Sequence, residues 1–155
     1  MRVKPKTNSY GYDSHMEILD NEVLIAKYFS ASEIKSQGLQ FYSEMQDGIQ
    51  VGTWNYDKGK LLQPHIHNLV EKVSGRTSEV LYVISGKVHV DIYNEDARLI
   101  REFQLNQGDL LICLNGGHGY QILEEGTHVL EVKNGPYFGP AVDRKRIQNE
   151  CRLQY

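Results

Sequence analysis

Residues 79–93 read EVLYVISGKVHVDIY, and this stretch decides the fold class. Two apolar runs flank the pair Ser85-Gly86, which is typical of a tight turn, so the stretch predicts two adjacent antiparallel strands. Side chains alternate between the two faces of a strand. The second run therefore has one apolar face and one polar face, and the polar face includes His89 and Asp91.

The first of these two strands is apolar on both faces. Leu81 and Val83 share one face, and the opposite face holds Val80, Tyr82 and Ile84. A strand that is apolar on both sides has to be covered on both sides. The N-terminal segment and another subunit are the two candidates for the second cover, and we expect a homodimer.

The rest of the chain is mostly strand and turn. Ser30 followed by Glu33 forms a capping-box pattern, which predicts a short helix ending near Gly38. Residues 1–21 predict a surface arm or an edge strand, and residues 143–152 predict a short charged helix. Many short strands between glycine-containing turns indicate an all-β sandwich or barrel. The further predicted strands are 23–29, 40–45, 49–56, 60–66, 99–105, 110–114, 119–123 and 127–133.

Composition excludes several classes of protein. The chain has 155 residues, which suits one domain, and its 40% hydrophobic and 24% charged residues are typical of a folded chain. A net charge of −3 with no strongly basic segment argues against binding to nucleic acid or to a membrane surface. No apolar run approaches the ~20 residues of a membrane span, and residues 1–10 lack the pattern of a secretory signal. Cys113 and Cys151 are too few for a disulfide framework, so we expect reduced thiols in a cytoplasmic protein.

Three of the six histidines combine with a glutamate in a pattern typical of metal binding. His65 and His67 are two residues apart at the end of a predicted strand, so their imidazoles share a face. Glu79 begins the strongest predicted strand and shares a face with Leu81. His118 follows an apolar strand and two glycines, whose backbone freedom permits a close approach. Imidazole suits zinc, copper, iron and nickel, and a carboxylate extends the range to manganese.

These spacings resemble the two motifs of the cupin superfamily over residues 49–133. The first motif, G-x5-H-x-H-x(3–4)-E-x6-G, is matched by Gly59 before the histidine pair and by Gly86 after Glu79. The second motif, G-x5-P-x-G-x2-H-x3-N, is matched by Gly108 and His118, which are ten residues apart.

The chain departs from the cupin pattern in three places. Eleven residues separate His67 from Glu79, where the motif has three or four. Leu114 stands in the place of the proline, and residues 121–122 replace the final asparagine.

The resemblance implies one cupin domain over residues 1–155, folded as a double-stranded β-helix (the jelly-roll barrel), with residues 134–155 as a tail. It implies that a divalent transition metal, Fe, Mn, Ni or Zn, is bound by His65, His67, Glu79 and His118. Glu71, three residues after His67, is the alternative carboxylate. We favour Glu79, because its place on the strand face of Leu81 aims it into the barrel.

Cupins include dioxygenases, isomerases, decarboxylases and sugar-modifying enzymes. The resemblance therefore implies a metal-dependent enzyme acting on a small polar substrate, either sugar-like or a keto or carboxylate compound, and residues 131–137 resemble the tail of stand-alone cupins of bacterial surface-sugar synthesis. The alternative is a non-catalytic, metal-supported binding or sensor domain. The pattern assigns no catalytic residue. The candidate substrate contacts are Tyr120, Arg76, Glu131 and Lys133, and the inserted residues 68–78 are expected at the barrel mouth.

Overall fold

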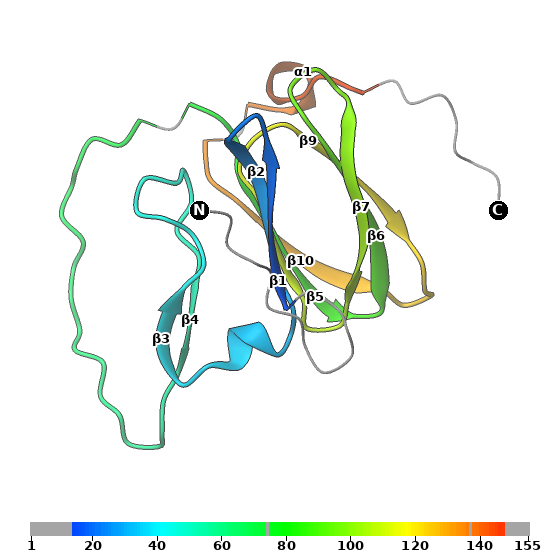
Figure 1. Ribbon diagram of the computed structural model, residues 1–155. Helices are drawn as coiled ribbons and strands as arrows, with labels where there is room; N and C mark the ends of the chain where they lie inside the picture. Colours follow the sequence, from blue (N-terminus) through cyan, green and yellow to red (C-terminus); the bar gives the residue numbers. More distant parts are fainter. Residues whose placement is uncertain (1–13, 74, 137, 148–155) are drawn as a thin grey trace.

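The computed structural model describes residues 14–73, 75–136 and 138–147, and most of its regular structure is antiparallel β-sheet (Figure 1). The all-β prediction is confirmed. The strands are β1 (His15–Asp20), β2 (Val23–Phe29), β3 (Gly38–Phe41), β4 (Gly52–Asn55), β5 (Glu79–Ser85), β6 (Lys87–Tyr93), β7 (Leu99–Asn106), β8 (Leu110–Cys113), β9 (Gly117–Ile122) and β10 (His128–Lys133).

Two of the three sheets pack against each other. One has five strands in the order β1-β2-β8-β5-β10, and the other has three in the order β7-β6-β9. Their facing sides enclose the main core, in which Val88, Val90 and Ile92 from β6 meet side chains of the five-stranded sheet such as Leu81 and Leu111. The period-two alternation in the sequence of β6 therefore places its apolar face inward, as predicted.

Strand register brings the chemically interesting residues to this interface. On β9, His118 is opposite Ile92 of β6, so it lies on the inward face of the three-stranded sheet. In the five-stranded sheet, Glu79 is opposite Cys113 of β8 on one side and opposite Lys133 of β10 on the other. Cys113, Glu79 and Lys133 therefore lie side by side on three neighbouring strands of the sheet.

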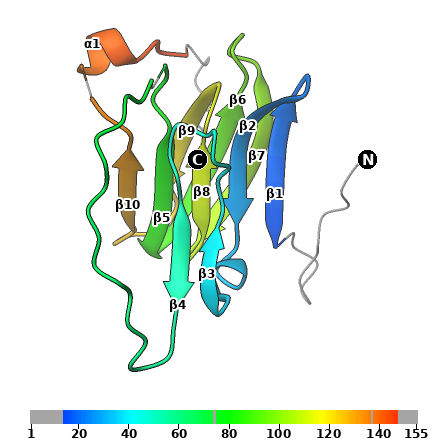
Figure 2. The same ribbon diagram turned by 90° about the vertical axis from the view of Figure 1, so that its left-hand side faces the viewer.

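The hairpin of β3 and β4 covers part of the outer face of the five-stranded sheet (Figure 2). A second apolar cluster forms there, where Tyr42, just after β3, packs with Phe29, Val80 and Ile112. The cover for the second face of β5 is therefore supplied partly by residues 38–55.

Residues 56–73 and 75–78, which connect β4 to β5, contain no helix or strand. They run as an extended connection outside the sheets (Figure 2). The predicted strand at 60–66 is wrong. An isolated apolar run cannot form a ladder without a neighbour, and Pro64 removes one of the donors that a ladder would need.

The chain ends agree with the predictions in part. Strand β1 is an edge strand, as predicted, while residues 1–13 lie outside the described residues. The helix predicted from Ser30 is only a 3₁₀ turn over Glu33–Lys35. The predicted tail helix is displaced, because the only helical turn there is α1 (Pro140–Asp143), residues 144–147 are not helical and residues 148–152 are not described. No helix in the described part of the chain is long and apolar enough to cross a bilayer.

Candidate functional site

Three charged side chains from both sheets meet inside the sandwich. Glu79 begins β5 and its side chain is only 10% exposed. Its Oε2 lies 2.9 Å from Nε2 of His118 on β9, and its Oε1 lies 2.8 Å from Nζ of Lys133 on β10. One carboxylate thus contacts a different cationic or basic group with each of its oxygens, and it joins the two sheets.

Cys113 and Tyr120 border this ion-pair cluster. The ring of Tyr120 stacks on that of His118, with centroids 5.1 Å apart and planes 24° from parallel. The hydroxyl of Tyr120 lies 3.7 Å from Sγ of Cys113, a free and buried thiol. The imidazole of His118 is therefore enclosed between an aromatic ring, a thiol and a carboxylate.

The electrostatics of the cluster favour the charged pair. Burial by itself would raise the pKa of Glu79, but hydrogen bonds from His118 and Lys133 lower this pKa from 4.5 to about 2. Burial would likewise lower the pKa of His118, but hydrogen bonds with Cys113 and Glu79 raise it from 6.5 to about 10. The pKa of Lys133 is raised despite partial burial, because Glu79 accepts a hydrogen bond from it. Burial raises the pKa of the Tyr120 hydroxyl, which therefore stays protonated.

Groups whose pKa values are strongly perturbed by burial together with a specific partner are candidates for functional sites. Lys133 also contacts Glu131 on its own strand, with Nζ and Oε1 3.3 Å apart. The ion-pair cluster and the side chains that border it thus bring together one imidazole, two carboxylates, one ammonium, one thiol and one phenol, with Glu131 half exposed at the edge.

The separation of Glu79 and His118 fits shared coordination of one ion. Two ligands at about 2.1 Å from an octahedral ion, at right angles to one another, are about 3.0 Å apart. The observed 2.9 Å between Oε2 of Glu79 and Nε2 of His118 agrees with this value. Their donor types, carboxylate oxygen and imidazole nitrogen, also suit a divalent transition metal. This half of the predicted ligand set therefore fits a metal ion.

The other half of the predicted set lies elsewhere. His65 and His67 are exposed on the connection between β4 and β5, with ring centroids 4.9 Å apart. Nδ1 of His65 is 3.1 Å from the carbonyl oxygen of Gln63. The alternative carboxylate, Glu71, is exposed on the same connection. Within residues 14–73, 75–136 and 138–147, no three of the four predicted ligands have donor atoms within 4.8 Å of one another.

The predicted substrate contacts are divided in the same way. Tyr120, Glu131 and Lys133 all border the ion-pair cluster. Arg76 instead forms an ion pair with Glu95 at the surface, where both side chains are about half exposed.

Sequence reasoning missed two features of these sites. It treated Cys113 only as a buried thiol, although the residue opposite Glu79 on β8 has to share its inward face. It also interpreted His89 and Asp91 as merely exposed, whereas Glu102 joins them in the structure. The signal for the second feature was the hairpin register, which places residue 102 opposite residue 91.

Comparisons of the chain with protein-family models, with curated proteins and with solved structures find no match. The structure is that of an all-β protein of antiparallel sheets with a buried ion-pair cluster between two of them.

Proposed function

We propose that this chain is a cupin-type, jelly-roll metalloprotein of the cytoplasm whose ion-pair cluster binds a divalent transition metal. The observation that supports this most directly is the 2.9 Å contact between Glu79 and His118. A metal ion would replace the proton between the two groups and keep both as ligands. Lys133, on the other oxygen of Glu79, then orients the carboxylate.

His65 and His67 complete the ligand set if their connection moves toward the sandwich. This segment has no ladder hydrogen bonds to break, since residues 56–73 and 75–78 form neither helix nor strand. Its apolar side chains are also poorly covered, with Ile66 94% and Leu69 102% exposed. Closure would bury some of that apolar surface, which favours a closed state once the ion is bound.

The proposed activity is a reaction on a small polar substrate, either sugar-like or a keto or carboxylate compound. A bound ion of this type supplies Lewis acidity or activates a water molecule. The ammonium of Lys133 and the hydroxyl of Tyr120 offer hydrogen bonds to substrate oxygens. Both side chains lie beside the proposed ligands, one on β10 and one on β9.

Metal content of tag-free protein tests the proposal. We expect plasma emission spectroscopy to show that H118Q, E79Q and H65A/H67A each lose the ion, while E71Q retains it. His128 is an exposed histidine outside the cluster, so H128Q is the matched control and should also retain it. Undiminished metal in both H118Q and E79Q would rule out this site.

A substrate panel separates an enzyme from a binding domain. Iron-loaded and manganese-loaded protein should convert at least one sugar, keto acid or carboxylate, and H118Q should not. A ligand that raises the melting temperature of the metal-loaded protein, with no turnover of any compound, would instead identify a non-catalytic binding or sensor domain.

A further inference from the structure

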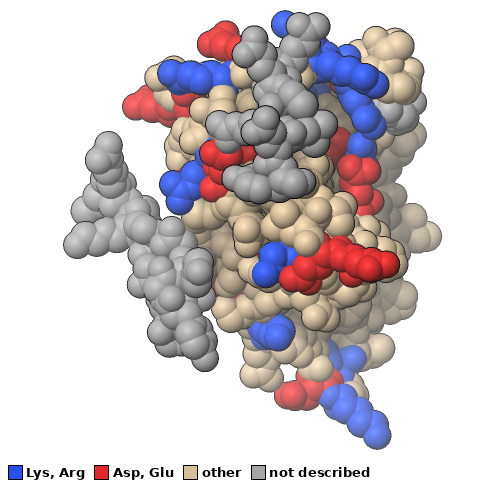
Figure 3. Space-filling view, turned by 90° about the vertical axis from the view of Figure 1, so that its right-hand side faces the viewer, with Lys and Arg blue, Asp and Glu red and all other residues tan. Residues whose placement is uncertain are grey.

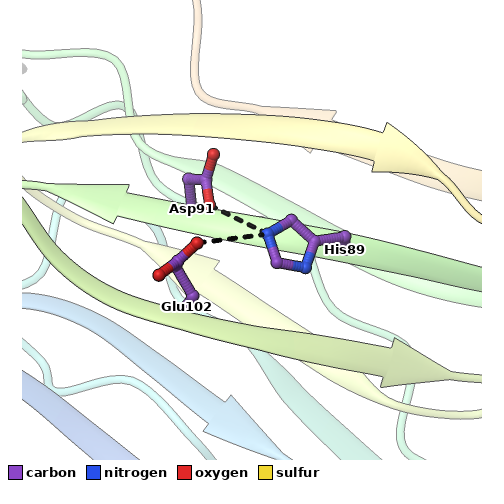
Figure 4. A group of neighbouring side chains, drawn as sticks. All are labelled: His89, Asp91 and Glu102. Atoms are coloured by element: carbon purple, nitrogen blue, oxygen red, sulfur yellow. Dashed lines mark hydrogen bonds and ion pairs between the residues drawn. The ribbon is translucent and has the colours of Figure 1, made fainter. Parts of the chain in front are cut away.

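A second group of metal-ligating side chains lies on the outer face of the three-stranded sheet. It consists of His89, Asp91 and Glu102, whose donor atoms are all within 4.8 Å of one another (Figure 4). Nε2 of His89 is 3.0 Å from Oδ1 of Asp91 and 3.8 Å from Oε1 of Glu102. The ion-pair cluster is on the inward face of this sheet, so the two groups are separated by the sheet itself.

The strands hold this triad in a fixed arrangement. His89 and Asp91 are two residues apart on β6, so their side chains share a face, and Glu102 of β7 is directly opposite Asp91. Strand β6 is the central strand of its sheet, paired on both sides. A site on such strands is positioned more firmly than one on a loop.

The charge pattern of the triad favours a cation. Two carboxylates directly opposite each other on neighbouring strands repel and destabilise the pairing. A divalent ion relieves this repulsion and uses the neutral imidazole of His89 as a ligand.

Within residues 14–73, 75–136 and 138–147, the surroundings orient the ligands and leave one side of the triad without a covering side chain. The hydroxyl of Tyr93 donates a hydrogen bond to Oδ2 of Asp91 at 3.1 Å, which leaves Oδ1 turned toward His89. Such a contact to the second oxygen is typical of metal-ligating carboxylates. On the other neighbouring strand, β9, the residue opposite Asp91 is Gly119, which has no side chain to cover the group.

We propose that His89, Asp91 and Glu102 form a binding site for a divalent transition-metal ion of the Zn²⁺ or Mn²⁺ type. One imidazole nitrogen with two carboxylate oxygens suits these ions. Three protein ligands leave further coordination positions for water on the open side. Figure 3 views this side of the molecule, where charged side chains form small groups of both signs on a largely uncharged surface. A compact cation fits such a small acidic group better than an extended polycation does.

Zinc titration of tag-free, chelator-treated protein tests the proposed surface site. We expect calorimetry to show two classes of site in the wild-type protein. H89Q and D91N should weaken binding at one of them by at least about tenfold, because loss of a group that only supports a metal ligand already costs about that much. H128Q and E125Q remove the same types of side chain from exposed positions and should leave both classes unchanged.

This titration tests the proposed surface site and the proposed interior site independently of one another. If H89Q and D91N bind zinc as the wild-type protein does, the triad is only a group of side chains in contact with one another, and the present inference is wrong. If H118Q loses no zinc while H89Q does, the surface site stands and the proposed function is wrong.

A structural readout locates the ion. In a nitrogen-15 NMR spectrum of H118Q, in which the interior site is removed, Mn²⁺ should broaden the amide signals of Tyr93 and Gly119, and it should spare them in the double variant H89Q/H118Q. Broadening of these signals that persists in H89Q/H118Q would overturn the inference. Circular dichroism melting of each variant confirms that the fold is intact, which we expect because His89 and Glu102 are partly exposed.

Discussion

Glu79 is the residue on which the interior cluster depends. Its two oxygens contact His118 and Lys133, and its side chain is 10% exposed. Removing one partner of a buried charge network leaves the remaining charges without compensation inside the fold, which typically costs about 3–5 kcal/mol. Lys133 keeps a second partner in Glu131, so we expect E79Q to lower the free energy of unfolding by about 3 kcal/mol, measured by urea denaturation.

The Lys87–Glu124 pair provides the matched control for E79Q. It joins the same types of charged group at 3.4 Å, but the side chain of Glu124 is 51% exposed. Exposed ion pairs contribute about 0–1 kcal/mol, so E124Q should change stability by less than about 1 kcal/mol. Equal losses in E79Q and E124Q would show that burial does not strengthen the interior cluster.

The pH dependence of stability in the metal-free protein follows from the same pair. The lowered pKa of Glu79 stabilises the fold above pH 4.5, and this contribution is lost as the pH falls toward about 2. The raised pKa of His118 stabilises the fold below pH 6.5, and this contribution is lost as the pH rises toward about 10. The pair therefore contributes most between pH 4.5 and 6.5.

Urea unfolding with a chelator present checks this pH profile. We expect the wild-type protein to exceed H118Q in stability most near pH 6 and by less near pH 9, because the unfolded state no longer protonates its imidazole there while the folded state gradually loses its proton. A difference between the two proteins that stays constant, or grows toward pH 9, would contradict the assigned protonation of His118.

At the scale of the element, the turn before β9 determines where His118 lies. Gly116 has a φ of +64°, and a Cβ there would run into the carbonyl oxygen of Tyr93. Gly126 has a similar φ of +73° but no atom within 4 Å of the corresponding Cβ position. An alanine in a left-handed backbone conformation lowers the stability of the fold by about 1–2 kcal/mol, so both substitutions are destabilising. Only G116A adds a steric clash.

We therefore expect G116A to be less stable than G126A by at least about 1 kcal/mol, measured by thermal or urea denaturation. Because β9 has to shift to relieve the clash, G116A should also weaken the proposed metal binding at His118, and G126A should not. If the two variants are equally stable, the contact between Gly116 and Tyr93 does not constrain the turn.

The strands between residues 79 and 133 could be predicted from the sequence almost to the residue. Strands β5 and β6 have the predicted bounds because the continuous apolar run of β5, the alternation of β6 and the glycine at 86 leave few other registers. The connection at 56–78 could not be predicted, because an apolar run with no partner strand looks the same in the sequence as one that is paired.

The candidate site contains both residues on predictable strands and residues on the connection that could not be predicted. Glu79 and His118 lie on well-specified strands of facing sheets, and their predicted approach appears as a 2.9 Å contact. His65 and His67 depend on the position of the connection, which no local pattern specifies. The sequence offers Lys133 only as a candidate substrate contact, because its contact with Glu79 depends on the pairing of β5 with β10. The paired residues of these strands are far apart in sequence, 43 positions for Ser85 and His128 and 54 positions for Glu79 and Lys133.

At the scale of the whole molecule, the described part of the chain covers only part of the outer face of the five-stranded sheet. The β3–β4 hairpin covers Val80, but Tyr82 stays 37% exposed and Leu130, on edge strand β10, 51%. Together with Trp54 of β4, 64% exposed, these residues line one apolar groove. Contiguous apolar surface is typical of interaction sites, and we propose a second copy of the chain as the partner, as the two-sided apolar pattern of β5 predicts.

We expect light scattering at micromolar concentration to give twice the chain mass of 17.8 kDa for the wild-type protein. L130E places a charge in the groove and should give the monomer mass, since an unpaired charge cannot be buried in an apolar interface. Leu19 is 49% exposed on β1, the opposite edge of the same sheet, so L19E adds the same charge at similar exposure and should remain dimeric. A monomeric wild-type protein would mean that this apolar face serves no contact between copies, and dissociation of L130E and L19E alike would move the interface away from the groove.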